Sequence, residues 1–147
     1  MKFKIILFAV ISLLPCLAFA QSQAQTNESL CNSYKRADTE LNSAYSQILN
    51  IYVKEKEFVQ RLKEAQRAWL LYRDAHVLAH FPSKKPGEYG SVQPGCECEI
   101  LLELTTARTK QLKEWLDGTI EGDVCAGSIK RESDIKKLKG QKIARLQ

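Results

Sequence analysis

The sequence predicts an all-helical protein: an antiparallel pair of helices, a third helix, disulfide bonds and a basic C-terminal tail. Apolar side chains recur at alternating steps of three and four residues over three long segments, which is the spacing of one buried helix face. No stretch alternates with a period of two for long enough to indicate a strand. Residues 82–95 contain three prolines and three glycines, and this composition is typical of a loop.

Residues 1–20 are organised like a cleavable signal peptide. Lys2 and Lys4 precede an apolar run over residues 5–17, and Ala18-Phe19-Ala20 places small residues where a signal peptidase reads. We therefore expect cleavage near the bond between Ala20 and Gln21 and a mature protein that is periplasmic or secreted.

Two other fates of this segment are less favoured. A retained membrane anchor needs about 20 apolar residues, which is more than the run provides. Lipidation at Cys16 would want a small residue before it, whereas Pro15 stands there. The mature chain would begin with a short linker, residues 21–27.

The three apolar stripes place helices near residues 28–52, 56–80 and 97–117. The stripe positions are Leu30, Tyr34, Ala37, Leu41, Ala44, Ile48 and Ile51; Phe58, Leu62, Ala65, Trp69, Tyr72, His76 and Ala79; and Leu101, Leu104, Arg108, Leu112 and Trp115. The first two stripes stay in phase across Ile51–Phe58, so one helix over residues 28–80 in a coiled-coil dimer is the alternative. Four charged residues among 53–57 and the rarity of so long a helix favour a hairpin.

The positive charge of the chain is concentrated at its C-terminal end. The formal net charge is +5, and loss of the two lysines of the signal peptide leaves +3. Residues 128–147 hold seven basic and two acidic side chains, a net charge of +5, so residues 21–127 carry −2. We expect a helical domain over residues 28–117 and a solvated tail over residues 118–147, which offers a contact to anionic envelope components.

Four cysteines remain after cleavage, and an even number in a small exported chain predicts two disulfides. An antiparallel helix pair brings Cys31 to the end at which the third helix begins, so either Cys96 or Cys98 is expected to bond to it. Cys125 would have to reach the cysteine left over. That reach is marginal, because the third helix carries the chain about 28 Å away.

The sequence contains no phosphate-binding glycine loop, no nucleophile elbow, no zinc-protease motif and no nucleic-acid-binding module. His76 and His80 share one helix face at a spacing that a metal ion could use, and the Cys96-Glu97-Cys98 segment is the nearest further source of ligands. Neither set forms a usual zinc pattern, and His76 belongs to a packing stripe. We expect a protein that is not an enzyme and has neither a cofactor nor a metal ion.

One segment resembles a known signature. Leu62-x-x-Ala65-Gln66-Arg67-Ala68-Trp69-x-x-Tyr72-Arg73-Asp74-Ala75 is similar to the core motif of the LprI-like lysozyme-inhibitor family, which consists of small exported bacterial proteins. The likeness covers roughly residues 28–116, with support from Ala37-x-x-x-Leu41-Asn42-x-x-Tyr45 and from the Cys98 to Leu112 segment. It implies a helical envelope protein and, for a named member, inhibition of lysozyme.

The resemblance also bears on the disulfides. Cys98 matches the family position, so the resemblance implies a Cys31–Cys98 bond and leaves Cys96 for Cys125. The family often has a cysteine directly after Arg-Asp-Ala, where this chain has His76-Val77. Cys96 and Cys125 are then additions of this chain.

The signature residues have a physical interpretation as helix contacts. They are Gln66, Arg67, Trp69, Tyr72, Arg73 and Asp74, with Arg108 in the stripe of the third helix. A buried arginine needs partners, so we expect Arg73 or Arg108 to link helices through several hydrogen bonds, with Asp74, Asp38 and Glu40 as available carboxylates.

A binding function follows as a hypothesis. The loop over residues 82–95 offers donors for the acidic cleft of a lysozyme or another cell-wall hydrolase: Lys84, Lys85, Tyr89 and Ser91. The alternative function is a structural or interaction protein of the envelope that uses the basic tail.

Overall fold

The computed structural model describes the backbone of residues 3–144 and the side chains of residues 22–141. Its helices are α1 (Phe3–Ile51), α2 (Lys56–His80), α3 (Gln93–Asp117) and α4 (Glu132–Ala144). The described residues contain no strand, only an isolated bridge between Thr119 and Arg131. The prediction of an all-helical fold is confirmed. The side chains of the predicted signal peptide lie outside the described residues.

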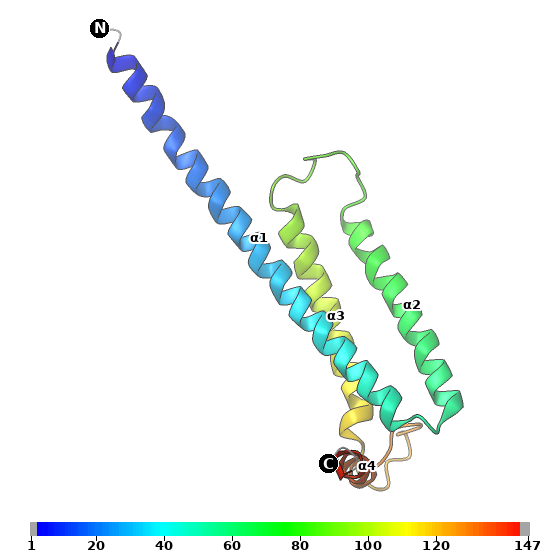
Figure 1. The fold of residues 1–147 in the computed structure, drawn as a ribbon. Coiled ribbons are helices and arrows are strands. Elements are labelled where there is room, and N and C mark those ends of the chain that lie inside the picture. The colour runs from blue at the N-terminus through cyan, green and yellow to red at the C-terminus, as the bar shows by residue number, and fades with distance from the viewer. Residues whose placement is uncertain (1–2, 145–147) are drawn as a thin grey trace.

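The first two helices form the predicted hairpin. α1 ends at Ile51, and α2 runs back beside it from Lys56, so the alternative of one continuous helix is wrong (Figure 1). The turn does not come from a glycine or a proline, since residues 16–81 contain neither. The chain turns where Tyr52 is buried in the core, 1% exposed, while the next residue, Val53, is 66% exposed. The Tyr52 N–H still donates to the Ile48 carbonyl, and the Glu55 N–H then donates to the Tyr52 carbonyl at 2.9 Å, which closes the turn into α2.

α1 begins earlier than predicted. Residues 22–27, expected as a linker, continue the helix, and Thr26 Oγ1 donates a hydrogen bond to the Ser22 carbonyl. Gln23 Nε2 also donates to Asn27 Oδ1 across one helical turn. The absence of a glycine or proline leaves nothing in this stretch to end a helix.

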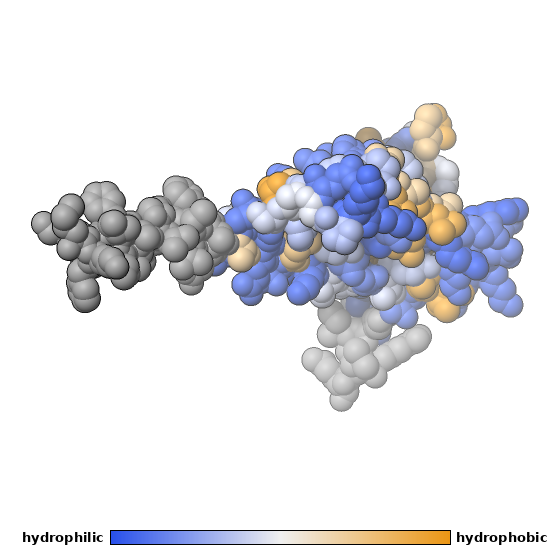
Figure 2. Space-filling model, turned by 90° about the horizontal axis from the view of Figure 1, so that it is seen from above, coloured by the Kyte–Doolittle hydropathy of each residue, from blue (hydrophilic) through white to orange (hydrophobic). Residues whose placement is uncertain are grey.

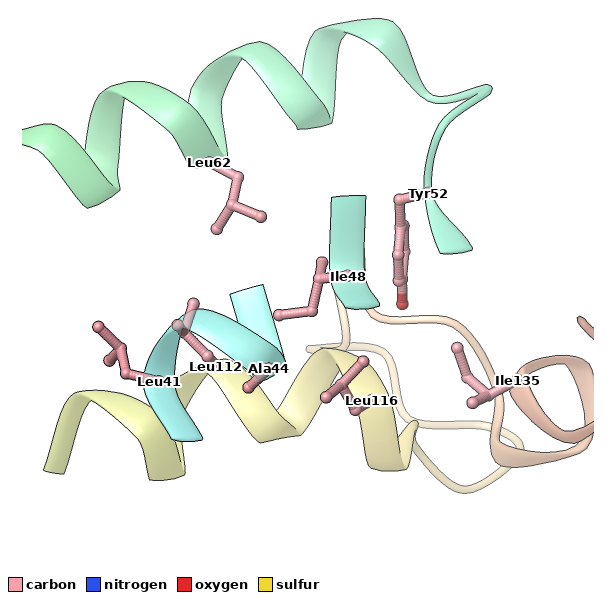
Figure 3. Close-up of a cluster of buried hydrophobic side chains, with 8 residues drawn as sticks. All are labelled: Leu41, Ala44, Ile48, Tyr52, Leu62, Leu112, Leu116 and Ile135. Carbon is pink, nitrogen blue, oxygen red and sulfur yellow. The ribbon is translucent and has the colours of Figure 1, made fainter. Parts of the chain in front are cut away.

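The core lies mainly between α1 and α3, which run in the same direction and pack along their length, whereas α2 touches them at fewer places (Figure 1). The buried apolar residues are Leu41, Ala44, Ile48, Tyr52, Leu62, Leu112, Leu116 and Ile135. Only Leu62 comes from α2, and Figure 3 shows it extending from that helix toward Ile48. α2 also packs the partly buried side chains of Phe58, Val59 and Trp69 against this core.

A disulfide joins α1 to α3 near the loop end of the molecule. It connects Cys31 and Cys98, whose Cα atoms are 4.9 Å apart, and this confirms the expected first bond. The expected bond between Cys96 and Cys125 is wrong, because both are free thiols. Cys96 lies in the first turn of α3 and Cys125 lies beyond the last turn, so the 25-residue helix separates them by its whole length.

The basic C-terminal segment is folded in its described part and is not the solvated tail that was expected. Ile135 of α4 is 1% exposed and packs in the core. The backbone N–H of Lys130 donates to the hydroxyl of Tyr52, which in turn donates to the Trp115 carbonyl. Gly118 turns the chain at φ 82°, where a Cβ atom would lie 2.8 Å from the Glu132 backbone, so this turn requires glycine.

Ion pairs and hydrogen bonds use most of the described positive charge of this segment. Lys130 pairs with Glu55, Arg131 with Glu121 and Asp134, and Lys136 with Glu132, while Lys139 donates to the Leu116 carbonyl. The side chains of Lys142 and Arg145 lie outside the described residues. These pairings leave less free charge for an anionic partner than the sequence suggests.

The coloured part of the face seen in Figure 2 is mainly hydrophilic, with apolar residues in separate patches. Among the residues that the structure describes, we find no helix with the length and hydrophobicity needed to span a membrane.

Candidate functional site

The loop between α2 and α3, residues 81–92, is the first candidate binding surface. α2 ends where the Phe81 N–H donates to the Val77 carbonyl and Pro82 follows. Within the loop, the hydroxyl of Tyr89 accepts the N–H of Ser83 at 3.0 Å, and the Tyr89 ring meets the Phe81 ring edge-on at 5.2 Å. Ser83 Oγ donates to Glu88 Oε2 at 2.6 Å. These contacts fold the loop onto itself.

The loop is also fastened to α1. Asn27 Nδ2 donates to the Ser91 carbonyl at 2.7 Å. Directly beyond, Gly95 is buried so closely against α1 that a Cβ atom there would lie 2.5 Å from Asn27 Oδ1. The Cys31–Cys98 disulfide follows one helical turn later. The loop therefore starts and ends on fixed supports.

The four residues proposed to contact a partner differ in their availability. Lys84 and Lys85 are exposed, and neither forms an ion pair within the described residues. Tyr89 is half-buried, and its hydroxyl is engaged with Ser83. Ser91 is exposed, but its carbonyl is occupied by Asn27. The two lysines are thus the donors that the loop presents, while Tyr89 and Ser91 hold it in shape.

Arg73 links α2 to α1. Its guanidinium lies 3.5 Å from Asp38 Oδ1 and 2.8 Å from Asp74 Oδ1, and it stands over the Trp69 ring at 5.4 Å. The Arg73 side chain is only 12% exposed, so these charge-assisted contacts are partly shielded from water. Tyr34 of α1 lies beside this group, and burial raises the pKa of its hydroxyl although the Arg73 charge opposes the shift.

Arg108 links α3 to α2 without a carboxylate. Its Nε donates to the side-chain oxygen of the buried Gln66 at 3.0 Å, and its Nη1 donates to Gln111 on its own helix. Partial burial lowers the pKa of Arg108. A neutral amide thus orients this guanidinium between the two helices.

The remaining signature residues point outward. Tyr72 is 54% exposed, and the Asp74 side chain is 62% exposed although it holds Arg73. Arg67 is exposed, and its Nε donates to the Lys63 carbonyl. The motif therefore has one face that joins helices and one face that meets solvent.

His76 and His80 lie within a row of contacting aromatic rings. Their ring centroids are 4.9 Å apart, and Tyr72 continues the row below His76 at 5.5 Å. In the described part of the chain, no three His, Cys, Asp or Glu side chains gather closely enough to hold a metal ion.

Two residues that connect distant parts of the structure are not identified from the sequence, one at the loop and one at the hairpin turn. Asn27 was assigned to a linker, yet it ties the loop to α1. Tyr52 was left out of the first stripe, yet it joins the hairpin turn to the C-terminal segment. The signal for Tyr52 was present, since it follows Ile48 by four residues and continues that stripe.

The comparison with known families agrees with this geometry. The chain matches the family described as "Lysozyme inhibitor LprI" over residues 16–112, which is more than half of its length. The chain belongs to the LprI family. The matched range contains the α2 signature, the loop and the disulfide, and it ends within α3, so the C-terminal segment lies outside it.

One curated relative is "Uncharacterized protein R02472" of Rhizobium meliloti (strain 1021). It is 34% identical over 110 residues, which cover 67% of this chain and 76% of the relative. No solved structure matches the chain. LprI membership points to an inhibitor of lysozyme rather than to an enzyme, and it fits an exported protein, as does the disulfide.

Proposed function

We propose that this LprI-family protein is exported, loses its signal peptide near Ala20-Gln21, and blocks the cleft of a lysozyme or related cell-wall hydrolase. The observation that carries the proposal is the loop over residues 81–92, which presents two exposed lysines from a fixed support. Glycosidases of this kind cut between two carboxyl groups, so their clefts attract cations. Lys84 and Lys85 supply two positive charges that are free of partners within the described residues.

The internal contacts of the loop support tight binding. A loop that is already ordered loses little conformational entropy when it docks. Here the Asn27–Ser91 and Tyr89–Ser83 hydrogen bonds hold the loop before any partner arrives. Complementary charge then mainly raises the association rate and fixes orientation.

The test measures the activity of several muramidases against cell-wall substrate in the presence of the mature protein. We expect inhibition at micromolar concentrations, and we expect Lys84→Ala/Lys85→Ala to weaken it at least tenfold. The matched control is Lys110→Ala/Lys137→Ala, which removes the same charge from exposed positions of α3 and α4 and should change inhibition less than twofold. Full enzyme activity with excess protein, or equal losses in both variants, would contradict the proposal.

A further inference from the structure

A groove along the N-terminal half of α2 forms a second surface that the loop does not explain. It has a volume of about 260 Å³ and is lined by Val53, Lys56, Val59, Gln60, Lys63 and Arg67. Three of the six lining residues are cations, and no acidic residue lines it. Since α-helices turn by 100° per residue, Lys56, Lys63 and Arg67 fall within about 40° of one line along α2.

What distinguishes the three cations of this groove is that they lie together with no carboxylate among the lining residues; other exposed basic residues, such as Lys84 and Lys85, also lack an ion pair within the described residues. Six basic residues form the eight ion pairs of the described residues: Arg61, Arg73, Lys113, Lys130, Arg131 and Lys136. Lys56, Lys63 and Arg67 form no such pair within the described residues. Like charges this close repel one another, so an anion in the groove would relieve the repulsion.

The carboxylate of Glu64, between Lys63 and Arg67 in the sequence, is engaged with other side chains. Glu64 lies close to Arg67, but its oxygens accept hydrogen bonds from Gln60 and from Arg61 at 3.1 Å each. The pKa of Glu64 is lowered first by these two hydrogen bonds, and the Arg67 charge contributes least. The Nε of Arg67 donates to the Lys63 carbonyl at 3.3 Å, and its two terminal nitrogens form no ion pair within the described residues.

We propose that this groove binds a ligand with two or three neighbouring phosphate groups and a small apolar part. Lys63 and Arg67 are about 6 Å apart along the axis of α2, and Lys56 lies about 10.5 Å before Lys63. An arginine guanidinium pairs with two phosphate oxygens at once, and lysine ammonium groups add point charges. The side chains of Val53, 66% exposed, and Val59 give the groove its apolar wall.

This inference goes beyond the proposed inhibition and does not depend on it. The groove lies at the hairpin-turn end of α2, whereas the loop follows the opposite end. An anion would thus bind at this groove of α2 and not at the C-terminal segment, where most of the described cations already have partners. Two sources of the ligand share its chemistry: a free oligophosphate and a phosphorylated lipid headgroup.

The experiment measures binding of tripolyphosphate to the mature protein by calorimetry at 20 and 150 mM salt. We expect saturable one-to-one binding that weakens with salt, as pairing of exposed charges requires. Lys63→Ala/Arg67→Ala should weaken binding at least tenfold, while Lys110→Ala/Lys137→Ala should change it less than twofold. Lys84→Ala/Lys85→Ala should leave it unchanged, which separates this site from the proposed inhibitory loop.

A second arm identifies the source of the phosphate. The same proteins are mixed with vesicles of phosphatidylcholine alone and with vesicles that also contain phosphatidic acid. Groove-dependent sedimentation with the phosphatidic acid vesicles assigns the site to lipid headgroups, and its absence together with tripolyphosphate binding assigns it to a free oligophosphate. Non-saturable binding, or equal losses in the groove and control variants of unchanged melting temperature, would overturn the proposal.

Discussion

Removal of the Cys31–Cys98 disulfide is expected to lower the free energy of unfolding by about 4 kcal/mol. The bond joins cysteines separated by 67 residues, and it therefore restricts nearly half of the chain in the unfolded state. In the chain-entropy relation, a loop of this size corresponds to about 15 cal/mol/K, or about 4 kcal/mol at 25 °C. Small domains unfold at about 5–15 kcal/mol, so the loss is a large part of the total.

The measurement compares urea unfolding of Cys31→Ser/Cys98→Ser with its parent, followed by tryptophan fluorescence and circular dichroism. Both proteins carry Cys96→Ser and Cys125→Ser, so that no free thiol can exchange with the Cys31–Cys98 bond of the parent. The two serine replacements alone should change stability by less than about 1 kcal/mol, since Cys125 is exposed and Cys96 is half-buried. A loss below about 1 kcal/mol for the disulfide variant would refute the reasoning, as would peptide mapping of the mature protein with all four cysteines that joins Cys31 to Cys96 or Cys125.

Three further predictions concern the contacts between elements. Tyr52→Phe should cost about 1–3 kcal/mol in urea unfolding, because it leaves buried backbone groups unpaired. Burial raises the pKa of Tyr52, so the folded state holds the phenol proton at higher pH than the unfolded chain does. The stability that Tyr52 contributes is therefore present below about pH 10 and is lost as the pH rises further. The free energy of unfolding of the variant should fall less steeply with pH in this range. Ile135→Ala should cost about 2–4 kcal/mol of unfolding free energy if α4 belongs to the core, and less than about 0.5 if that segment is solvated. Arg73→Lys should lower the melting temperature more than Lys110→Ala does, since lysine cannot contact Asp38 and Asp74 at once.

The sequence predicted the helices well where apolar spacing decides them. The boundaries of α2 agree with the expected range, because the stripe from Phe58 to Ala79 ends at Pro82. The hairpin was also predictable, although its cause was only partly seen. Charges over residues 53–57 indicated a turn, but the hydrogen bonds that join Tyr52 to Trp115 and Lys130 are long-range contacts that periodicity does not report.

The C-terminal segment was harder to predict because its fold depends on partners far away in the sequence. Ile135 is one apolar residue among many lysines, and its burial requires the pocket that Leu116 and Tyr52 help to form. Lys130 looked like free charge until Glu55 of the hairpin turn was placed beside it. Net charge counts side chains, whereas the available charge depends on which of them find partners. The same limit hid the basic groove within a region whose net charge is negative.

The two proposed binding surfaces lie at opposite ends of α2, and the way in which this helix is attached explains why its signature is mostly polar. Apolar contacts have no direction, so a helix held by them alone can settle at several rotations about its axis. Hydrogen bonds are directional, and the one that Arg108 of α3 donates to Gln66 fixes α2 to α3, while the ion pair of Arg73 with Asp38 attaches α2 to α1. Gln66 and Arg73 are seven residues apart, so both links lie on one face of α2 and tie it to two different helices. Together they set the direction in which Lys63 and Arg67 face solvent and the place at which the loop leaves Phe81.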